Sequence, residues 1–216
     1  MDVVYVVAEE PRNEELRYSL RSLKNVPHDK VWIAGHVPEW ARVHGVPSPQ
    51  PNNRNRWENS TSNLQAALAE EVSEHFLFFN DDFFILEPVD GFPPRHLGPI
   101  QKQTWPEMAA VDALLKSTGI PAPLNYELHT PMEMVVWRAR EALQIVDRTG
   151  THRHKRTVYG NLAAIGGESL ADVKVHGLGK TPSGALTSTN STSWDGVAGK
   201  RIREMFPEPS EYEEPR

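Results

Sequence analysis

The strongest constraint on the fold lies in the first 35 residues, where two short apolar runs flank an amphipathic segment. The runs Val3–Ala8 and Val31–Ala34 are typical of strands buried on both faces of a parallel sheet. Between them, Asn13 can cap a helix whose leucines recur with helical spacing from Leu16 to Leu23. The order strand, helix, strand predicts a βαβ unit with a right-handed crossover, and hence an α/β fold.

The alternation of strands and helices continues along the chain. Thr130, Pro131 and Glu133 form a helix start signal, because Pro131 suits the first helical position and Glu133 completes a capping box. The polar segments His44–Asn59 and Gly177–Ser193 are predicted to be loops. The remaining pattern predicts a helix capped by Ser60 or Thr61 and reaching about Val72, a strand over Phe76–Phe79, helices over Thr104–Thr118 and from Pro131 to about Val146, a strand over Ala171–His176, and a last helix over Trp194–Met205.

Composition excludes several classes of protein. A chain of 216 residues is long enough for one sizeable domain, which we expect over residues 1–206, followed by an acidic, proline-rich tail over residues 207–216. Because cysteine is absent, the chain has no disulfide scaffold, thiolate zinc site or cysteine nucleophile. The longest apolar runs are far shorter than the roughly 20 residues that span a bilayer. The first residues lack a basic region and a cleavage site, so we expect no signal peptide and a cytoplasmic location.

The charge of the chain argues against a broad nucleic-acid-binding surface. The net charge is −6, and the last ten residues, with four Glu and one Arg, supply half of it. The body is therefore only mildly acidic, although a locally basic groove is compatible with this balance.

The segment around Asn80, Asp81 and Asp82 carries the most chemical information. These polar residues interrupt a phenylalanine-rich run directly after a predicted buried strand. Ligands bind at the carboxyl ends of strands in open α/β sheets, and paired carboxylates there suit Mg²⁺ or Mn²⁺ with a diphosphate. The alternative is a tight turn between two strands of a hairpin, held by Asx-type hydrogen bonds.

Two histidines and two basic segments complete the candidate site. His129 lies beside the predicted start of a helix and can act as a base or nucleophile, or only pack there. The cluster from His152 to Arg156 can bind phosphate through its arginines, or form a solvated basic loop. His176 can complete a metal site begun by Asp82, or serve a structural role. The segment Asn52–Trp57 suits a lid over a nucleotide or acceptor, or an ordinary surface loop.

Several segments together resemble the Stealth family, which includes capsular-polysaccharide sugar-phosphate transferases and a lysosomal-enzyme N-acetylglucosamine-1-phosphotransferase. Asp2–Tyr5, Glu15–Leu23 and Val37–Trp40 resemble its opening block, and Leu77–Phe84 resembles its second block. The segments His129–Met132 and Arg153–His154 resemble two later, shorter blocks in the same order. The blocks span roughly residues 2 to 160, whereas residues 177–216 show no block of the family, and the chain lacks the insertions of its longer members.

The resemblance implies a fold and a set of roles. The fold would be GT-A-like, a mixed and mostly parallel sheet flanked by helices. Asn80, Asp81 and Asp82 would hold a divalent metal, Mn²⁺ or Mg²⁺, on the donor diphosphate. His176 lies outside the matching blocks and is a candidate metal ligand through its place after the late strand alone. His129 would be the catalytic histidine and Arg153 a phosphate contact. The N-terminal βαβ unit would cradle the nucleotide. The candidate residues for binding the donor are Arg17, Arg21, Asn80 and Arg156.

The expected function is therefore that of a metal-dependent transferase with a nucleotide-sugar donor, such as a UDP-sugar. It would transfer a sugar or a sugar 1-phosphate to an acceptor hydroxyl, most simply that of a glycan. A second hypothesis places the acceptor on a DNA base, bound by the basic segments around Arg54–Arg56, Arg153–Arg156 and Lys200–Arg203. A third hypothesis is a non-catalytic module that binds a sugar nucleotide or a divalent ion.

Overall fold

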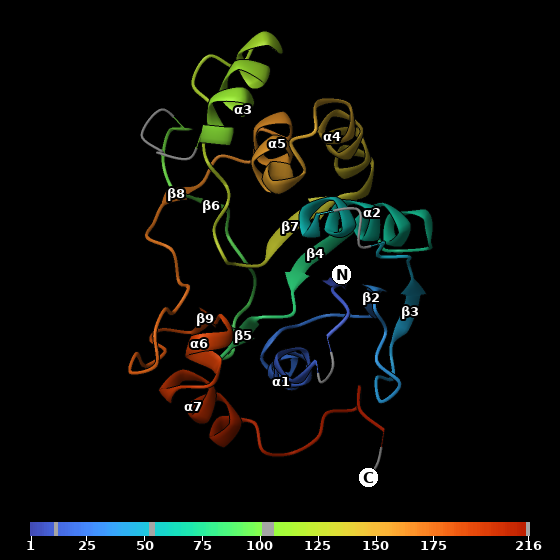
Figure 1. The fold of residues 1–216 in the computed structure, drawn as a ribbon, viewed down its shortest axis with the longest axis vertical. Helices are drawn as coiled ribbons and strands as arrows, with labels where there is room; N and C mark the ends of the chain where they lie inside the picture. The colour runs from blue at the N-terminus through green and yellow to red at the C-terminus, as the bar shows by residue number, and fades with distance from the viewer. Residues whose placement is uncertain (11–12, 52–54, 101–105, 215–216) are drawn as a thin grey trace.

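A computed structural model describes residues 1–10, 13–51, 55–100 and 106–214 of the chain. Its centre is a five-stranded sheet in the order β3-β2-β1-β4-β7 (Figure 1). The strands β1 to β4 of this sheet are mutually parallel, and the edge strand β7 runs antiparallel to β4. The strands are β1 (Asp2–Val7), β2 (Val31–Gly35), β3 (His44–Pro47), β4 (His75–Asn80) and β7 (Met132–Val135). The predicted βαβ unit and the mixed, mostly parallel sheet are thus present.

One face of the sheet packs against a layer of helices that come from the middle of the chain. Because side chains alternate along a strand, Val4 and Val6 of β1 face this layer together with Phe76 and Phe78 of β4. Figure 1 shows the layer above the sheet. Its helices are α2 (Arg56–Ala69), α3 (Pro106–Ser117), α4 (Val136–Thr149) and α5 (Lys155–Leu162), with the short helix η3 (His152–His154) before α5.

The opposite face is covered by the helix that the leucine spacing predicted. Leu16 and Leu20 of α1 (Glu14–Ser22) are buried against Val3, Tyr5 and Val7 of β1. Asn13 precedes α1 as expected, but its side chain donates a hydrogen bond to the Ala8 carbonyl at 3.2 Å instead of capping the helix. The short helix η1 (Leu23–Asn25) continues α1 toward β2.

The C-terminal part of the chain, together with β5, forms a smaller unit below the sheet (Figure 1). In this unit, the strand β5 (Phe83–Ile85) pairs with β9 (Leu186–Ser188). A separate pair, β6 (Arg95–His96) with β8 (Glu168–Ser169), lies near α3 and α5 in the view of Figure 1. Two helices, α6 (Ser191–Trp194) and α7 (Val197–Met205), pack on Phe84 through Trp194, whose ring stacks on that of Phe84 at 5.4 Å. The strand β5 therefore ties this unit to the main sheet directly after Asp82.

The prediction that a helix starts at Pro131 is wrong for its first turn. Residues Met132–Val135 form strand β7, and helix α4 begins only at Val136. Met132 and Met134 are buried opposite Phe78 and Phe76 of β4, so pairing with the sheet overrides the local capping signal.

The segment predicted as a loop over residues 44–59 contains a strand at its start and the beginning of a helix at its end. Residues His44–Pro47 are strand β3, paired with β2. Helix α2 starts at Arg56, earlier than Ser60, because Asn55 accepts hydrogen bonds from the Trp57 and Glu58 amides and forms a capping box with Glu58. Residues 52–54 of the predicted lid and residues 104–105 of the predicted third helix lie outside the described residues.

The segment predicted as a strand over Ala171–His176 is irregular, with only an isolated bridge between Lys174 and Ser188. The predicted loop Gly177–Ser193 contains β9 and the start of α6, and its Thr187, Ser188 and Thr189 are buried. The second half of this segment is therefore packed, whereas most of residues 177–184 are exposed, as expected for a loop. Among the described residues, no helix is long and apolar enough to cross a membrane.

The acidic tail packs on α1 through one buried carboxylate. Glu213 is 5% exposed, and it receives hydrogen bonds from Arg21 at 2.6 and 2.9 Å and from Arg17 at 2.8 Å. Arg21 also donates to the carbonyls of Phe206 and Pro207. Burial by itself would raise the pKa of Glu213, but its hydrogen bonds from Arg21 and the Ser210 amide lower it to about 2.

We predict that Glu213 makes the folded state sensitive to acid. A carboxylate with a lowered folded-state pKa stabilises the protein above its unfolded pKa of 4.5, and this contribution disappears as pH falls toward 2. Glu213→Gln should lower the free energy of unfolding at pH 7 by up to about 3 kcal/mol and by far less at pH 2.5. Urea unfolding at both pH values measures this, with the exposed Glu208→Gln as the matched control. Equal losses at the two pH values would contradict the prediction.

Candidate active site

Four carboxylates gather where β1 and β4 end. Asp81 and Asp82 follow β4, Glu10 follows β1, and Glu15 lies in the first turn of α1. These residues are called the acidic cluster below. Since β1 and β4 are neighbouring parallel strands, their carboxyl ends meet at one edge of the sheet, the edge at which open α/β sheets bind ligands.

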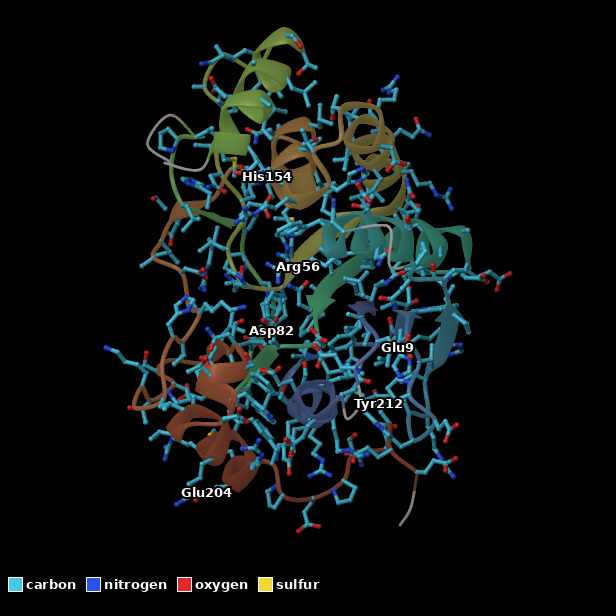
Figure 2. The ribbon with its side chains drawn as sticks, in the orientation of Figure 1. Glu9, Arg56, Asp82, His154, Glu204 and Tyr212 are labelled. Carbon is cyan, nitrogen blue, oxygen red and sulfur yellow. The ribbon has the colours of Figure 1, made fainter. Side chains whose placement is uncertain are left out.

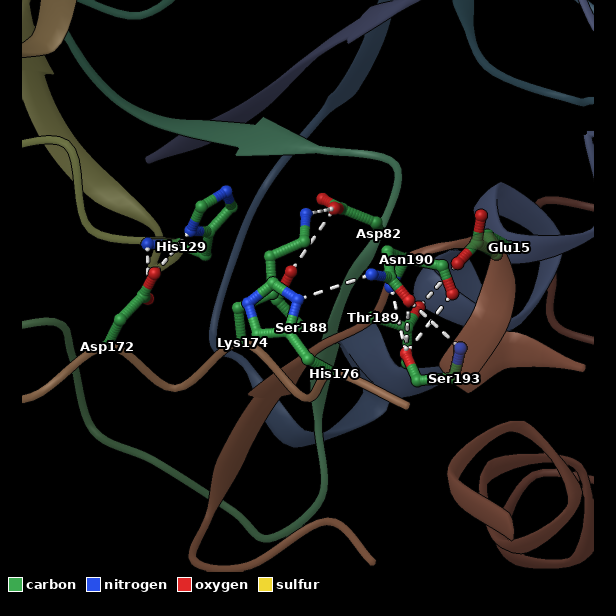
Figure 3. Close-up of polar contacts among 10 residues, drawn as sticks. All are labelled: Glu15, Asp82, His129, Asp172, Lys174, His176, Ser188, Thr189, Asn190 and Ser193. Atoms are coloured by element: carbon green, nitrogen blue, oxygen red, sulfur yellow. Dashed lines mark hydrogen bonds and ion pairs between the residues drawn. The ribbon is translucent and has the colours of Figure 1, made fainter. Parts of the chain in front are cut away.

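Asp82 has one satisfied and one unsatisfied carboxylate oxygen. Lys174 Nζ donates to Asp82 Oδ2 at 2.7 Å, and Ser188 Oγ donates to the same atom at 3.2 Å (Figure 3). The other oxygen, Oδ1, is buried and has no hydrogen-bond partner among the described residues. A buried carboxylate oxygen without a partner is costly, so this atom is suited to receive a ligand.

The acidic cluster carries more negative charge than its neighbours compensate. Burial, followed by the charges of Asp82, Glu15 and Glu10, raises the pKa of Asp81 well above its usual value. Burial and the charges of Asp82 and Glu10 raise the pKa of Glu15 to about 7, although its hydrogen bond with Thr189 and the charge of Lys174 act in the opposite direction. Like charges held this close favour binding of a cation.

His129 forms a hydrogen-bonded pair with a carboxylate that the sequence did not single out. Its Nδ1 lies 2.6 Å from Asp172 Oδ2, and its backbone amide donates to Asp172 Oδ1 at 3.0 Å. Burial would raise the pKa of Asp172, but the hydrogen bond and charge of His129 lower it overall. Figure 3 shows the second ring nitrogen of His129 turned away from Asp172. Asp172 therefore orients the ring and leaves Nε2 available as a proton acceptor.

A pocket of about 220 Å³ lies between β4 and the helix layer. It brings together four residues that the sequence assigned to the site, namely Asn80, His129, Arg153 and Arg156. Arg56 and Trp57, from the segment predicted to be a lid, also line it. Its remaining lining residues are Ser60, Phe78, Glu127, Leu128 and Lys155. In the view of Figure 2, Arg56 lies between His154 and Asp82. This pocket is called the cationic pocket below.

A wider cleft of about 730 Å³ opens at the carboxyl ends of β1 and β2. Its lining residues are Glu9, Glu10, Asn13, Arg17, His36, Pro38, Glu39 and Trp40. The Arg17 guanidinium lies 4.2 Å from the centre of the Trp40 ring and is also paired with Glu213. Arg21, the other arginine expected to contact a nucleotide, lies elsewhere, because all of its donors are directed to the tail.

The residues expected to hold a metal are only partly assembled. His176 is exposed, and its Nδ1 lies 3.3 Å from Asn190 Nδ2. Within the described residues, no group of three or more His, Asp or Glu side chains has a geometry that could hold a metal ion. Of the expected metal ligands, Asp81 and Asp82 therefore lie together at the edge of the sheet, and Lys174 is the positively charged residue beside them.

The basic segments considered for a DNA groove do not form one stripe. Lys200 and Arg203 lie on α7 below the sheet, whereas Arg56 and Arg153 lie at the helix layer above it (Figure 1). Arg203 is bound to Glu14 at 2.9 Å. Arg54 lies outside the described residues.

Sequence reasoning missed Asp172, Lys174 and Glu15 as members of the site. Asp172 and Lys174 lie in an irregular segment, so no periodicity marked them. Glu15 lies in the first turn of α1, where an acidic residue also suits the helix dipole, so its sequence position does not by itself point to a ligand.

Two solved structures of the galactosyltransferase LgtC match nearly the whole chain. An active-site mutant of LgtC superposes with a TM-score of 0.57 at 11% identity, covering 95% of this chain and 95% of that chain. LgtC in complex with donor and acceptor sugar analogs superposes with a TM-score of 0.54 at 10% identity, covering 97% of this chain and 96% of that chain. LgtC has a GT-A fold, so the predicted GT-A-like fold is confirmed.

Comparisons of sequence give no match. No protein-family model matches the chain, and a search of curated proteins finds no relative. The resemblance to the Stealth family therefore stays a hypothesis that rests on the segments quoted above.

Proposed function

We propose that this protein is a glycosyltransferase-type enzyme that uses a nucleotide-sugar donor, such as a UDP-sugar, and a divalent cation. The observation that carries the proposal is the placement of Asp81 and Asp82 beside the His129–Asp172 pair, at the ligand-binding edge of a GT-A-like sheet. Asp81 and Asp82 are suited to bind the cation of a donor diphosphate. The His129–Asp172 pair is suited to remove a proton from an acceptor.

The donor would extend along the edge of the sheet. The wide cleft beside Arg17 and Trp40 offers an aromatic ring and a guanidinium to a nucleoside, and it shares Glu10 with the acidic cluster. A nucleotide bound there would direct its diphosphate toward Asp81 and Asp82. Asn80, the last residue of β4, lines the cationic pocket and so lies between the donor side and His129.

The acidic cluster fits a divalent cation by charge and by donor chemistry. Asp82 Oδ1 is an unpartnered hard oxygen, and the crowding that raises the pKa of Asp81 is relieved by a cation. Asp81 and Asp82 would hold the cation, with the diphosphate and water as its other ligands. When bound, Mn²⁺ or Mg²⁺ would neutralise charge on the leaving phosphates. Lys174, already 2.7 Å from Asp82, adds a fixed positive charge beside them.

His129 would act as the general base. Asp172 fixes the ring by binding Nδ1, so Nε2 is the atom that accepts the proton of the acceptor hydroxyl. The deprotonated oxygen then forms a bond to the donor. Attack at the anomeric carbon releases the nucleoside diphosphate, and attack at the β-phosphorus, the reaction of the Stealth-like transferases, releases the nucleoside monophosphate. The same residues serve both reactions, with a glycan hydroxyl as the simplest acceptor.

A thermal-shift screen of nucleotide-sugars with and without Mn²⁺ tests the proposal. Ligand binding to the folded state stabilises it by about 2.7 kcal/mol at a hundredfold excess over the dissociation constant. We expect one nucleotide-sugar to raise the unfolding temperature only when Mn²⁺ is present. Turnover of the same donor would then exclude a non-catalytic binding module. If no nucleotide-sugar raises the unfolding temperature, the proposal is wrong.

A further inference from the structure

The cationic pocket is lined by more basic than acidic side chains among the described residues. Its lining includes the basic side chains Arg56, Arg153, Lys155 and Arg156. Arg153 is paired with Glu107 at 3.5 Å outside the pocket. Among the described residues of the lining, Glu127 is the one carboxylate, and its Oε1 accepts a hydrogen bond from the Thr157 amide at 3.0 Å.

Arg156 is buried and incompletely bonded. It is 6% exposed, and its guanidinium lies 4.7 Å from the centre of the Phe78 ring and 5.4 Å from that of Phe83. Nη1 donates to the Thr130 carbonyl at 2.6 Å, whereas Nη2 has no partner among the described residues. A buried guanidinium nitrogen without an acceptor is costly, so an acceptor supplied by a ligand would satisfy it.

Lys155, next to Arg156 in the chain, is also buried and weakly hydrogen-bonded. It is 7% exposed, and the hydrogen bond of its Nζ is a long one, 3.4 Å to the His152 carbonyl. Burial lowers the pKa of Lys155 to about 8 and that of Arg156 to about 10, despite the nearby charge of Glu127. Two adjacent buried cations at the start of α5 are a preformed environment for an anion.

Lys155 and Arg156 lie close to the proposed general base. Arg156 and Lys155 share a pocket with His129, and the carboxylates of Asp82 and Asp172 both act electrostatically on Arg156. The acidic cluster repels anions unless a cation is bound. A ligand oxyanion at Arg156 would therefore bind on the His129 side of Asn80, apart from a donor diphosphate at Asp81 and Asp82.

Resting on the proposed function, we propose that Lys155 and Arg156 form a subsite for an oxyanion of the acceptor, a phosphate or a carboxylate. The acceptor of this enzyme is thus an acidic sugar or sugar phosphate. Its oxyanion accepts hydrogen bonds from Arg156 Nη2 and Lys155 Nζ, and this places a neighbouring hydroxyl beside His129. Arg56 and Trp57 of α2 line the same pocket.

Titration calorimetry with inorganic phosphate, in the absence of divalent cations, tests the subsite. We expect phosphate to bind the wild-type protein and to lose at least tenfold in affinity in both Arg156→Gln and Lys155→Met. The exposed Arg201→Gln on α7 is the matched control and should leave the affinity unchanged. Thermal unfolding checks that each variant is folded, and Lys155→Met carries the test if Arg156→Gln is not. If phosphate does not bind the wild-type protein, or binds both variants as tightly as the wild type, the subsite is overturned.

A second titration separates the acceptor from the donor as the source of the oxyanion. The phosphate titration is repeated in the presence of saturating UDP and Mg²⁺. An unchanged phosphate affinity supports a subsite distinct from the donor, and competition overturns the assignment to the acceptor. Failure of the proposed function appears separately, as absence of nucleotide-sugar binding, and does not alter the phosphate titration of the free protein.

Discussion

Replacing Asp82 with asparagine is expected to reduce Mn²⁺-dependent binding of the nucleotide-sugar by at least a hundredfold while the protein stays folded. The substitution keeps one oxygen and nearly the same shape, so a hydrogen bond from Lys174 or Ser188 can persist. It removes the negative charge that a cation needs, and it can place an amide where Asp82 Oδ1 now lies unpartnered. Calorimetric titration with the donor, with and without Mn²⁺, measures the loss.

Asp90→Asn is the matched control, because Asp90 is exposed and follows the same β4–β5 region of the chain. It should leave donor binding unchanged. The alternative from the sequence is that Asp82 merely stabilises a turn between β4 and β5. In that case Asp82→Asn would lower the free energy of unfolding by about 1 kcal/mol, as for other lost side-chain hydrogen bonds, and leave donor binding intact.

The parts of the fold that the sequence predicts correctly are those set by local patterns. The buried strands β1, β2 and β4 are continuous apolar runs, and α1 has leucines at helical spacing, so each element can be recognised without its neighbours. The end of β4 at Asn80 follows from the change from phenylalanine to polar residues. The edge at which the acidic cluster forms was therefore predictable.

The elements that the sequence does not predict depend on distant partners. Strand β7 forms because Met132 and Met134 pack opposite β4, and the Thr-Pro-x-Glu signal contains no information about that pairing. Asp172 and Lys174 reach the site from an irregular segment, bound to His129 and Asp82 respectively, residues 43 and 92 positions earlier in the chain. Arg21 is a predicted nucleotide contact, but its guanidinium binds Glu213 of the tail, whereas Arg17 lines the wide cleft although it also pairs with Glu213.

The second large effect is expected at His129. A general base acts on the chemical step and contributes little to ground-state donor binding. His129→Ala should lower turnover by about 10²-fold or more, with donor affinity changed by less than about tenfold. His75→Ala is the matched control, because His75 also pairs with a carboxylate, Glu133 at 3.0 Å, but lies at the opposite end of β4. It should leave turnover unchanged.

The partner of His129 provides an independent test of the same role. Asp172 accepts from Nδ1 and so keeps the proton off Nε2, whereas the amide of an asparagine can donate to Nδ1 and favour the opposite tautomer. Asp172→Asn should therefore lower turnover although His129 is retained. Its Oδ1 can still accept from the His129 amide, so the backbone contact at 3.0 Å is preserved. Steady-state kinetics with saturating donor measures the effect.

His129→Gln separates a catalytic from a structural histidine. Glutamine is similar in size and can keep a hydrogen bond with Asp172, so it should preserve the fold in either case. It has no side-chain atom that accepts a proton near neutral pH, so it should be as inactive as His129→Ala if Nε2 is the base. If His129 only supports the segment before β7, His129→Ala would instead lower the free energy of unfolding by roughly 1–2 kcal/mol, and turnover per folded molecule would be unchanged. A stable and fully active His129→Gln protein would remove His129 from the mechanism, and the proton of the acceptor would then have to leave through another group.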